Sequence, residues 1–337
     1  MIILGIESSC DETAVAIVNS DRKILSNQIY SQIKEHKNFG GVVPEVAARS
    51  HIECLPYLFQ QSLKEASLTY PALDGVAVTA GPGLIGGVMV GVIFAKTIAS
   101  ILKKPFIAVN HLEGHALTVR LTDKIEFPYL LLLASGGHCQ FLLVECVAKY
   151  KQISTTVDDA AGEAFDKVAK MLNLDYLGGP AIEKMALHGN PKAFQFPKPL
   201  CEPNRYELSF SGLKTSVRQL IEKNKSNIEY IKNDICASFQ DTVTEIFLYK
   251  INQAIEIINK DWPQEVNSFV IAGGVAANKY IREKISKFVI NQGYNFIAPP
   301  VNLCTDNAAM IAWAGLERLQ IGLSNNLDFK PLSRWAL

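Results

Sequence analysis

A strand, a short turn of small or polar residues and a second strand occur twice in this chain, and this repeat restricts the fold more than any other feature. The first copy has apolar runs at 2–7 and 13–18 around the turn 8–12, and the second has runs at 129–134 and 139–144 around the turn 135–138. Helical periodicity follows each copy, so that strands and helices alternate from end to end. We therefore predict an α/β fold with a duplicated architecture.

Apolar runs predict further strands over residues 24–30, 73–79, 106–110 and 269–272, and helical periodicity predicts helices over 159–172, 180–187 and 235–258. Pro44 is expected to begin a helix, because its missing N–H would lack a helical partner in the first turn anyway, and Pro56 is expected to bend that helix. Residues 190–207 are rich in Pro, Lys and Asn and are predicted to form a long loop.

One stretch, residues 83–102, has the length and apolarity of a membrane-spanning helix. Lys96 interrupts it, and Gly86, Gly87 and Gly91 lie within it. These features favour a buried core helix over a span. The apolar N-terminal run is too short for a signal peptide and lacks a basic start. We therefore expect a soluble, cytoplasmic protein with no membrane partner.

Charge and cysteine usage exclude several classes of protein. Lys and Arg together number 33, as do Asp and Glu, so the formal net charge is zero. A protein that binds nucleic acid through a basic surface alone is therefore disfavoured, whereas a local patch or a partner subunit is still compatible with a nucleic-acid substrate. The seven cysteines are scattered and never spaced as CxxC, which fits reduced thiols and neither a disulfide framework nor a zinc ribbon.

His111 and His115 form the sharpest local signal. Residues four apart share one face of a helix, so both imidazoles can reach one metal ion. The spacing is similar to the HExxH motif, but the glutamate here is Glu113, which lies on a different face from the base of a zinc protease. The alternative interpretation is two ordinary, partly buried histidines at the start of a helix.

Asp306 is the best candidate for a third ligand, because two ligands do not complete a metal site. It precedes the helical run that begins at Ala308, and an acid at that place also stabilises a helix dipole without any other role. Two histidines and one carboxylate leave open coordination positions and suit Fe²⁺ or Zn²⁺ acting as a Lewis acid. The spacing alone does not choose between these metals.

Two glycine-containing turns leave predicted strands, at residues 135–138 and 273–278. Turns without side chains let backbone N–H groups approach a phosphate or carboxylate, and the second turn ends at a helix N-terminus. Neither turn fits the dinucleotide-binding GxGxxG pattern or the P-loop, which argues against a dehydrogenase or a P-loop NTPase. Asp166 is a candidate for accepting hydrogen bonds from ribose hydroxyls. Asp11 and Glu12, in the first turn, either position a reactant or are ordinary turn residues.

Taken together, these segments resemble the TsaD-type tRNA N6-adenosine threonylcarbamoyltransferases, once named O-sialoglycoprotein endopeptidases. The resemblance covers almost the whole chain. It rests on Gly5 to Thr13, Gly41 to Glu45, Asn110 to His115, Ser135 to His138, Gly162 to Lys167, Ser209 to Thr215, Gly273 to Asn278 and Thr305 to Asn307.

The resemblance implies the actin and sugar-kinase (ASKHA) fold, with two ribonuclease-H-like lobes around a nucleotide cleft. We expect lobes at residues 1–109 and 110–337, with the option that the C-terminal helix packs back on the first lobe. The implied reaction moves the threonylcarbamoyl group from threonylcarbamoyl-AMP to N6 of adenosine 37 in tRNAs that read codons beginning with A, and it releases AMP. The implied partners are TsaB-like and TsaE-like subunits, and the implied cofactor is one divalent metal, with iron (Fe²⁺) favoured and Zn²⁺ possible.

The resemblance also assigns residues. The family's metal ligands fall on His111, His115 and Asp306. Its adenylate-binding positions fall on Leu133, Ala134, Ser135, Gly136, Gly137, Asp166, Gly179 and Asn278, with Glu183 where a ribose-contacting acid is usual. We further hypothesise that Asp11 assists proton loss from the attacking amine.

Three other functions stay open at this point. They are a kinase or ATPase on the same fold, a glycoprotein endopeptidase, and a non-catalytic scaffold of a tRNA-modifying complex. Paired histidines favour a softer metal than the magnesium of a kinase, and Glu113 does not supply the base of a protease. Because the net charge is zero, we expect tRNA affinity to depend on partner proteins and on a local patch near Lys192, Lys198, Arg205 and Lys214.

Overall fold

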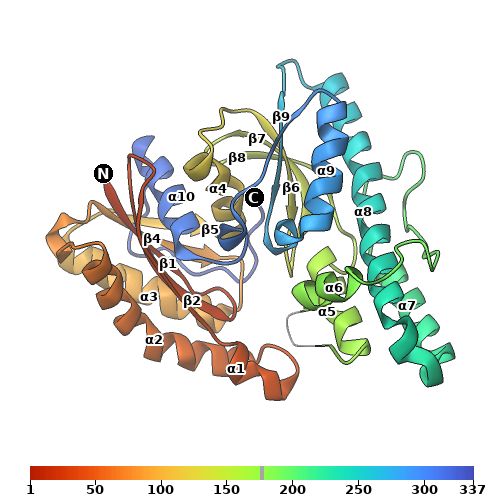
Figure 1. The fold of residues 1–337 in the computed structure, drawn as a ribbon. Coiled ribbons are helices and arrows are strands. Elements are labelled where there is room, and N and C mark those ends of the chain that lie inside the picture. Colours follow the sequence, from red (N-terminus) through yellow and green to blue (C-terminus); the bar gives the residue numbers. More distant parts are fainter. Residues whose placement is uncertain (175–177) are drawn as a thin grey trace. The chain divides into compact units, whose positions relative to one another are not determined.

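The computed structural model describes residues 1–174 and 178–337 (Figure 1). The chain forms two compact units. The first comprises residues 1–126, 146–149 and 305–337, and the second comprises residues 127–145 and 150–304. The first unit is thus discontinuous in sequence. The lobe boundary that the sequence analysis expects after residue 109 stays a prediction. The compact units described here divide the chain at residues 126, 145, 149 and 304 instead.

The first unit is built on a five-stranded mixed sheet with the order β3-β2-β1-β4-β5. Its strands are β1 (Ile2–Glu7), β2 (Glu12–Asn19), β3 (Ile24–Ser31), β4 (Gly75–Gly81) and β5 (Phe106–Asn110). β1, β2 and β3 form an antiparallel meander, whereas β4 and β5 continue the sheet in parallel with β1. The parallel strands are connected by helices, as parallel pairing requires.

Helices cover both faces of this sheet, because alternate residues of its strands point to opposite sides. Leu4 and Ile6 pack in a core with residues of α2 (Pro44–Glu65) and α3 (Ile85–Leu102). Gly5 lies against α10 (Ala308–Gln320), which also packs on α4 (His111–Thr122) (Figure 1). A short helix, α1 (Ile33–His36), follows β3. Helix α10, near the C-terminal end of the sequence, therefore covers one face of the sheet that contains the first strand.

The second unit repeats this arrangement with the strand order β10-β9-β6-β7-β8. Its strands are β6 (Tyr129–Ala134), β7 (Cys139–Cys146), β8 (Lys149–Thr155), β9 (Ser268–Ala272) and β10 (Asn295–Ile297). β6 and β7 are antiparallel, and β9 and β10 extend the sheet in parallel with β6. Read from β8, the order matches that of the first sheet strand for strand, which confirms the predicted duplication and the ASKHA-type fold.

Within residues 127–174 and 178–304, the second unit contains several α-helices. They are α5 (Ala161–Met171), α6 (Gly178–Ala186), α7 (Ser211–Lys223), α8 (Ile228–Asp261) and α9 (Lys279–Asn291). Their apolar faces form one core with the sheet, in which Phe165 and Phe239 meet edge to face with ring centroids 5.0 Å apart.

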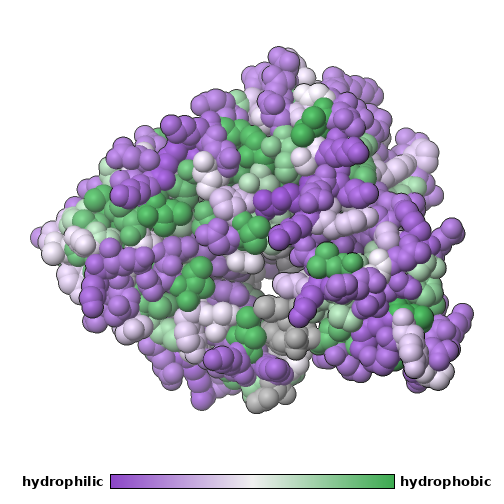
Figure 2. Space-filling view, viewed as in Figure 1, coloured by the Kyte–Doolittle hydropathy of each residue, from purple (hydrophilic) through white to green (hydrophobic). Residues whose placement is uncertain are grey.

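On the face shown in Figure 2, hydrophilic side chains separate patches of hydrophobic ones.

The long loop predicted over residues 190–207 contains no helix or strand. The buried Lys250 of α8 anchors this loop. The ammonium group of Lys250 donates hydrogen bonds to the carbonyl oxygens of Leu200 and Arg205 at 2.7 and 2.6 Å. The side-chain oxygen of Gln253 accepts a third bond. A buried ammonium group is stable here because each of its donors has an acceptor.

Helix α3 is only partly buried, whereas the sequence predicted a buried core helix. It is long and apolar enough to cross a membrane, but 39% of that stretch is buried in the structure, and length and composition are weak grounds for a span. One face packs on β4 and α2, where Gly87 and Gly91 allow close approach to Ser8. The opposite face is exposed, and its apolar side chains are Ile85, Met89, Ile93 and Ile101.

Candidate functional site

Helix α4 places two imidazoles side by side. The helix begins directly after β5, where the side chain of Asn110 accepts a hydrogen bond from the N–H of Leu112 at 2.9 Å and so caps the first turn. His111 and His115, one turn apart, present rings whose centroids are 4.9 Å apart and nearly perpendicular. Both side chains are buried. The predicted helical face with two histidines is therefore present.

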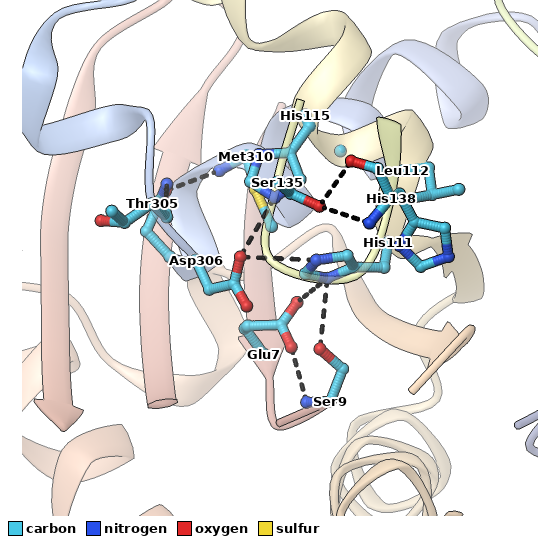
Figure 3. A network of polar contacts seen from close by, with 12 residues as sticks. Glu7, Ser9, His111, Leu112, His115, Ser135, His138, Thr305, Asp306 and Met310 are labelled. Atoms are coloured by element: carbon cyan, nitrogen blue, oxygen red, sulfur yellow. Dashed lines mark hydrogen bonds and ion pairs between the residues drawn. The ribbon is translucent and has the colours of Figure 1, made fainter. Parts of the chain in front are cut away.

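Asp306 reaches the same two rings from a distant part of the sequence. Asn307 caps α10 by accepting the N–H of Met310 at 3.0 Å, so that Asp306 is held just before the helix. Its Oδ1 lies 3.0 Å from Nε2 of His115 and 3.4 Å from Nε2 of His111 (Figure 3). One candidate ligand atom from each residue lies within 4.8 Å of the others. The predicted convergence of the three side chains is confirmed.

The electrostatics of this group favour a positive charge at its centre. Burial alone would raise the pKa of the Asp306 carboxyl, but the charge of His111 and hydrogen bonds from both imidazoles outweigh it, so the pKa lies well below its ordinary value. Burial alone would lower the pKa of His111, but the charges of Asp306 and Glu7 raise it well above its ordinary value. The imidazole thus lies between the buried carboxylate of Glu7 and the partly buried carboxylate of Asp306.

The residues present fit a divalent metal. Two imidazole nitrogens face one carboxylate oxygen, and this donor set is typical of non-haem Fe²⁺ and of Zn²⁺. The surrounding negative charge offsets the cost of burying a cation. The group is therefore compatible with a divalent metal ion.

Glu113, on the same helix, serves another contact. Its carboxylate accepts a hydrogen bond from the N–H of Ala148 at 3.2 Å and pairs with Nε of Arg318 on α10 at 3.3 Å. A second ion pair joins the helices, since Nε of Arg120 lies 2.8 Å from the carboxylate of Glu317. Glu113 thus helps to join α4 to α10, as expected for a glutamate that is not a protease base.

Sequence reasoning missed a second acid at this site. Glu7 is the last residue of β1, is buried, and places Oε2 3.0 Å from Nδ1 of His111. Its carboxylate also accepts hydrogen bonds from the N–H of Ser9, at 2.6 Å, and from the hydroxyl of Thr79 in β4. The signal was an ionisable residue that ends an otherwise apolar, buried strand, because such a charge requires partners.

The turn after β1 carries the other acids named from the sequence. The backbone oxygen of Asp11 accepts a hydrogen bond from the N–H of Gln32 at 3.0 Å, which fixes the turn against the end of β3. Burial raises the pKa of Glu12 well above its ordinary value, and the charges of Asp306 and Asp11 add to the effect. The catalytic role of Asp11 stays a prediction.

In the second unit, the predicted adenylate-binding turn follows β6. Leu133 and Ala134 are buried residues that end the strand. The turn closes through hydrogen bonds from the N–H of Ser135 to the oxygen of His138 at 2.7 Å, and from the N–H of His138 to Oγ of Ser135 at 3.1 Å. A Cβ atom added at Gly136 or at Gly137 would meet nothing within 4 Å. Open space therefore adjoins the backbone of this turn.

Two other glycines bring neighbouring segments against this turn. The N–H of Gly162, at the start of α5, donates to the oxygen of Ser135 at 3.1 Å, and a Cβ there would lie 2.6 Å from the same oxygen. Gly273 has a φ of +89°, and a Cβ there would lie 2.5 Å from the oxygen of Ala134. Only glycine permits both contacts without a shift of the backbone.

The remaining predicted adenylate contacts belong to the same region. Asp166 accepts the N–H of Gly178 at 3.1 Å, next to Gly179, where an added Cβ would meet nothing within 4 Å. Glu183 accepts the N–H of Lys279 at 2.7 Å. Asn278 caps α9, accepting the N–H of Ile281 at 3.0 Å, and its amide donates to Gln240 at 2.7 Å. Their role in binding adenylate stays a prediction.

The predicted basic patch in this unit carries acidic partners. Lys192 pairs with Asp241 and Glu245, and Lys198 pairs with Glu245 as well. Arg205 lies 3.7 Å from Glu207, and Lys214 pairs with Asp159. These acids reduce the positive field that the four basic residues would otherwise present to a phosphate backbone.

Solved structures with this fold differ widely in sequence. The activator of 2-hydroxyisocaproyl-CoA dehydratase from Clostridium difficile aligns over 97% of this chain and 99% of its own, with a TM-score of 0.53 and 14% identity. HypF from T. kodakarensis aligns over 95% of this chain and 48% of its own, with a TM-score of 0.60 and 15% identity. Both likenesses support the ASKHA-type fold alone.

The sequence comparisons are closer. The profile of the TsaD family, tRNA N6-adenosine threonylcarbamoyltransferase, matches residues 23–313. A protein of that name from Rickettsia bellii is 56% identical over 335 residues, which cover 99% of this chain and 98% of the relative. Another from Brucella anthropi is 53% identical over 342 residues, covering 100% of this chain and 95% of the relative. The chain therefore belongs to the TsaD family.

Proposed function

We propose that this protein transfers the threonylcarbamoyl group from threonylcarbamoyl-AMP to N6 of adenosine 37 in tRNAs that read codons beginning with A, releasing AMP. The observation that carries the proposal is the cluster of His111, His115 and Asp306 in a chain of the TsaD family. Because the substrate is a tRNA, we place the reaction in the cytoplasm.

In this proposal, the three clustered side chains hold one divalent metal, Fe²⁺ in preference to Zn²⁺. A metal bound there would supply Lewis acidity toward a carbonyl oxygen. The side chains themselves orient their donor atoms toward one point, and their burial keeps water away from two of the three ligands. Rigid placement by α4 and by the cap of α10 fixes the geometry before the substrate arrives.

We assign the adenylate part of the substrate to the second unit, to Leu133, Ala134, Ser135, Gly136, Gly137, Asp166, Gly179, Glu183 and Asn278. The open space beside the two glycines of the first turn supports this assignment, because backbone N–H groups there are accessible to an oxyanion. Asp166 and Glu183 supply carboxylate acceptors of the kind that bind ribose hydroxyls. AMP is a stable leaving anion, so the reaction does not require a strong general acid.

The attacking adenine amine is a poor nucleophile, so positioning of the reactants has to contribute much of the rate. We assign Asp11 the role of accepting the proton that the amine loses. Its position in the turn after β1, where the residue is partly exposed, supports this role, since a proton acceptor must reach the substrate. An Asp11→Ala variant that keeps the wild-type rate of single-turnover transfer would remove the assignment.

We also propose that this chain works with TsaB-like and TsaE-like subunits. The apolar stripe on the exposed face of α3, formed by Ile85, Met89, Ile93 and Ile101, supports a protein partner, because such contiguous surfaces usually bind another chain. A charged substitution, Ile93→Glu, should abolish co-elution with a TsaB-like subunit in size-exclusion chromatography. Unchanged co-elution would place the partner elsewhere.

The deciding experiment mixes purified protein, partner subunits, synthetic threonylcarbamoyl-AMP and unmodified tRNA, and then digests the tRNA to nucleosides. The proposal expects threonylcarbamoyladenosine and AMP in equal amounts. Modification that persists when this chain is omitted would indicate a scaffold. ATP turnover by this chain alone, without modified tRNA, would indicate a kinase or ATPase instead.

A further inference from the structure

One side of the His111 ring faces Asp306, and the other faces Glu7. Nε2 lies 3.4 Å from Oδ1 of Asp306, whereas Nδ1 lies 3.0 Å from Oε2 of Glu7 and 3.2 Å from Oγ of Ser9 (Figure 3). A neutral imidazole carries one proton, and the nitrogen without it is the one that can bind a metal. The partner of Nδ1 therefore decides whether Nε2 has a free electron pair.

The surroundings of Glu7 suit its carboxylate to accept a hydrogen bond from the N–H of Nδ1. Its Oε1 accepts the N–H of Ser9 at 2.6 Å, and its Oε2 accepts the hydroxyl of Thr79 as well as facing Nδ1. Ser9 and Thr79 are buried, so the carboxylate at the end of β1 is held by the turn that follows β1 and by β4. A carboxylate with these three neighbours presents acceptors on all sides.

We propose that Glu7 is a positioning residue, whose carboxylate keeps the proton of His111 on Nδ1 and so directs the Nε2 electron pair toward Asp306 and a bound metal. The inference rests on the proposed function of the cluster, because it assigns that cluster a metal. A hydrogen-bonded partner on the outer nitrogen of a ligating histidine commonly fixes the ring and its tautomer.

The substitution Glu7→Gln tests this role because it keeps the shape of the side chain and reverses one of its polar atoms. If the new NH₂ group occupies the Oε1 position, it faces the N–H of Ser9, and two donors meet. If it occupies the Oε2 position, it faces Nδ1, which must then accept, and the proton moves to Nε2. In either orientation Nδ1 loses its charged acceptor, because it faces a neutral amide oxygen or the NH₂ group. The electron pair of Nε2 is then a weaker ligand for the metal or is lost to a proton.

The measurement is the dissociation constant for Zn²⁺ and for Co²⁺, obtained by competition with a chromophoric chelator. We expect the Kd of Glu7→Gln to rise by about 10- to 100-fold, as removal of such an outer partner usually causes. The matched control is Glu113→Gln, which changes a buried glutamate on the histidine helix whose carboxylate pairs with Arg318. It should leave the Kd unchanged even if it lowers the stability.

A spectroscopic readout separates positioning from general damage. In Zn²⁺-loaded wild-type protein labelled with ¹⁵N-histidine, the His111 resonances should show a protonated Nδ1 and a metal-bound Nε2. Glu7→Gln should lose this pattern at equal metal loading. If that variant does not fold, Thr79→Val, which removes one bond to the carboxylate and leaves Glu7 in place, should weaken binding in the same direction.

The outcomes are distinct. Equal Kd values and equal His111 resonances in folded Glu7→Gln and in the wild type would overturn this inference and leave the proposed function standing. If Glu7→Gln does not fold, a Thr79→Val variant that binds the metals with wild-type affinity would also overturn this inference. Wild-type protein that binds neither metal would overturn the proposed metal centre, and this inference with it.

Discussion

Gly5 is a point of close approach between β1 and α10, and replacing it with alanine should disturb both the stability and the proposed metal centre. A Cβ atom at this position would lie 2.3 Å from the backbone oxygen of Ala308 and 2.5 Å from the backbone nitrogen of Ala312. Ordinary contacts begin near 3.4 Å, so the backbone of α10 must move by roughly 1 Å. Neither obstacle is the end of a flexible side chain.

This shift has two consequences. Overpacking a core by one carbon typically costs about 1–3 kcal/mol, so Gly5→Ala should lower the free energy of unfolding by that amount. Asp306 lies two residues before Ala308, so its carboxylate should move away from the two imidazoles. A displacement of about 1 Å can reduce catalysis by about 10²-fold, and we expect the transfer rate to fall by this order.

The assay combines urea unfolding, metal affinity and single-turnover transfer. Gly41→Ala is the matched control, because a Cβ there would meet nothing within 4 Å, and it should change none of the three quantities appreciably. Gly5→Ala with wild-type stability and wild-type metal affinity would refute the reasoning, since it would mean that α10 tolerates the extra carbon without moving.

Three further predictions concern other parts of the molecule. His115→Ala should keep the fold and weaken Zn²⁺ binding by more than the roughly 10- to 100-fold that loss of an outer partner causes, as chelator competition would show; wild-type affinity would exclude His115 as a ligand. Lys250→Met should cost about 1 kcal/mol, because the carbonyl oxygens of Leu200 and Arg205 lose a donor in partly buried hydrogen bonds, and limited proteolysis should become faster within residues 190–207. Burial alone would raise the pKa of Asp158, but hydrogen bonds from Ser209, Ser211 and the N–H of Phe210 hold the pKa below its ordinary 3.8. The stabilisation from Asp158 is therefore present above pH 3.8 and is lost as the pH falls through the lowered pKa. Asp158→Ala should lower the free energy of unfolding by about 1 kcal/mol at pH 7 and by progressively less in acid. An equal loss at pH 7 and pH 3 in urea titrations would contradict this.

Much of the fold could be predicted from local patterns. The strands Ile2–Glu7, Phe106–Asn110 and Tyr129–Ala134 have the predicted bounds, because each is a continuous apolar run between polar turns. The edge strands β8 and β10 were missed, because β8 alternates exposed charged and polar residues and β10 is only three residues long. Edge strands carry little of the hydrophobic signal on which such predictions depend.

The candidate site, like the fold, contains residues that the sequence could identify and residues that it could not. Spacing placed His111 and His115 on one helical face. Asp306 was named because two ligands do not complete a metal site, and the family resemblance then assigned it as a ligand, although no local pattern connects it to the histidines. Glu7 was missed, because its role depends on a side chain that meets His111 across two elements far apart in the sequence. The exposed face of α3 was missed for a related reason, since its composition is apolar on all sides and periodicity has no contrast to detect.

The discontinuity of the first unit has a consequence for synthesis on the ribosome. The sheet opens with the first residues to emerge, but α10, which covers it, and Asp306, which faces the histidines, come from residues 305–337. The intervening unit is continuous apart from four residues, so it can collapse while the earlier sheet is still uncovered. A nascent chain therefore presents two imidazoles without the Asp306 carboxylate until its synthesis is almost complete, so the proposed metal site is one of the last features to form.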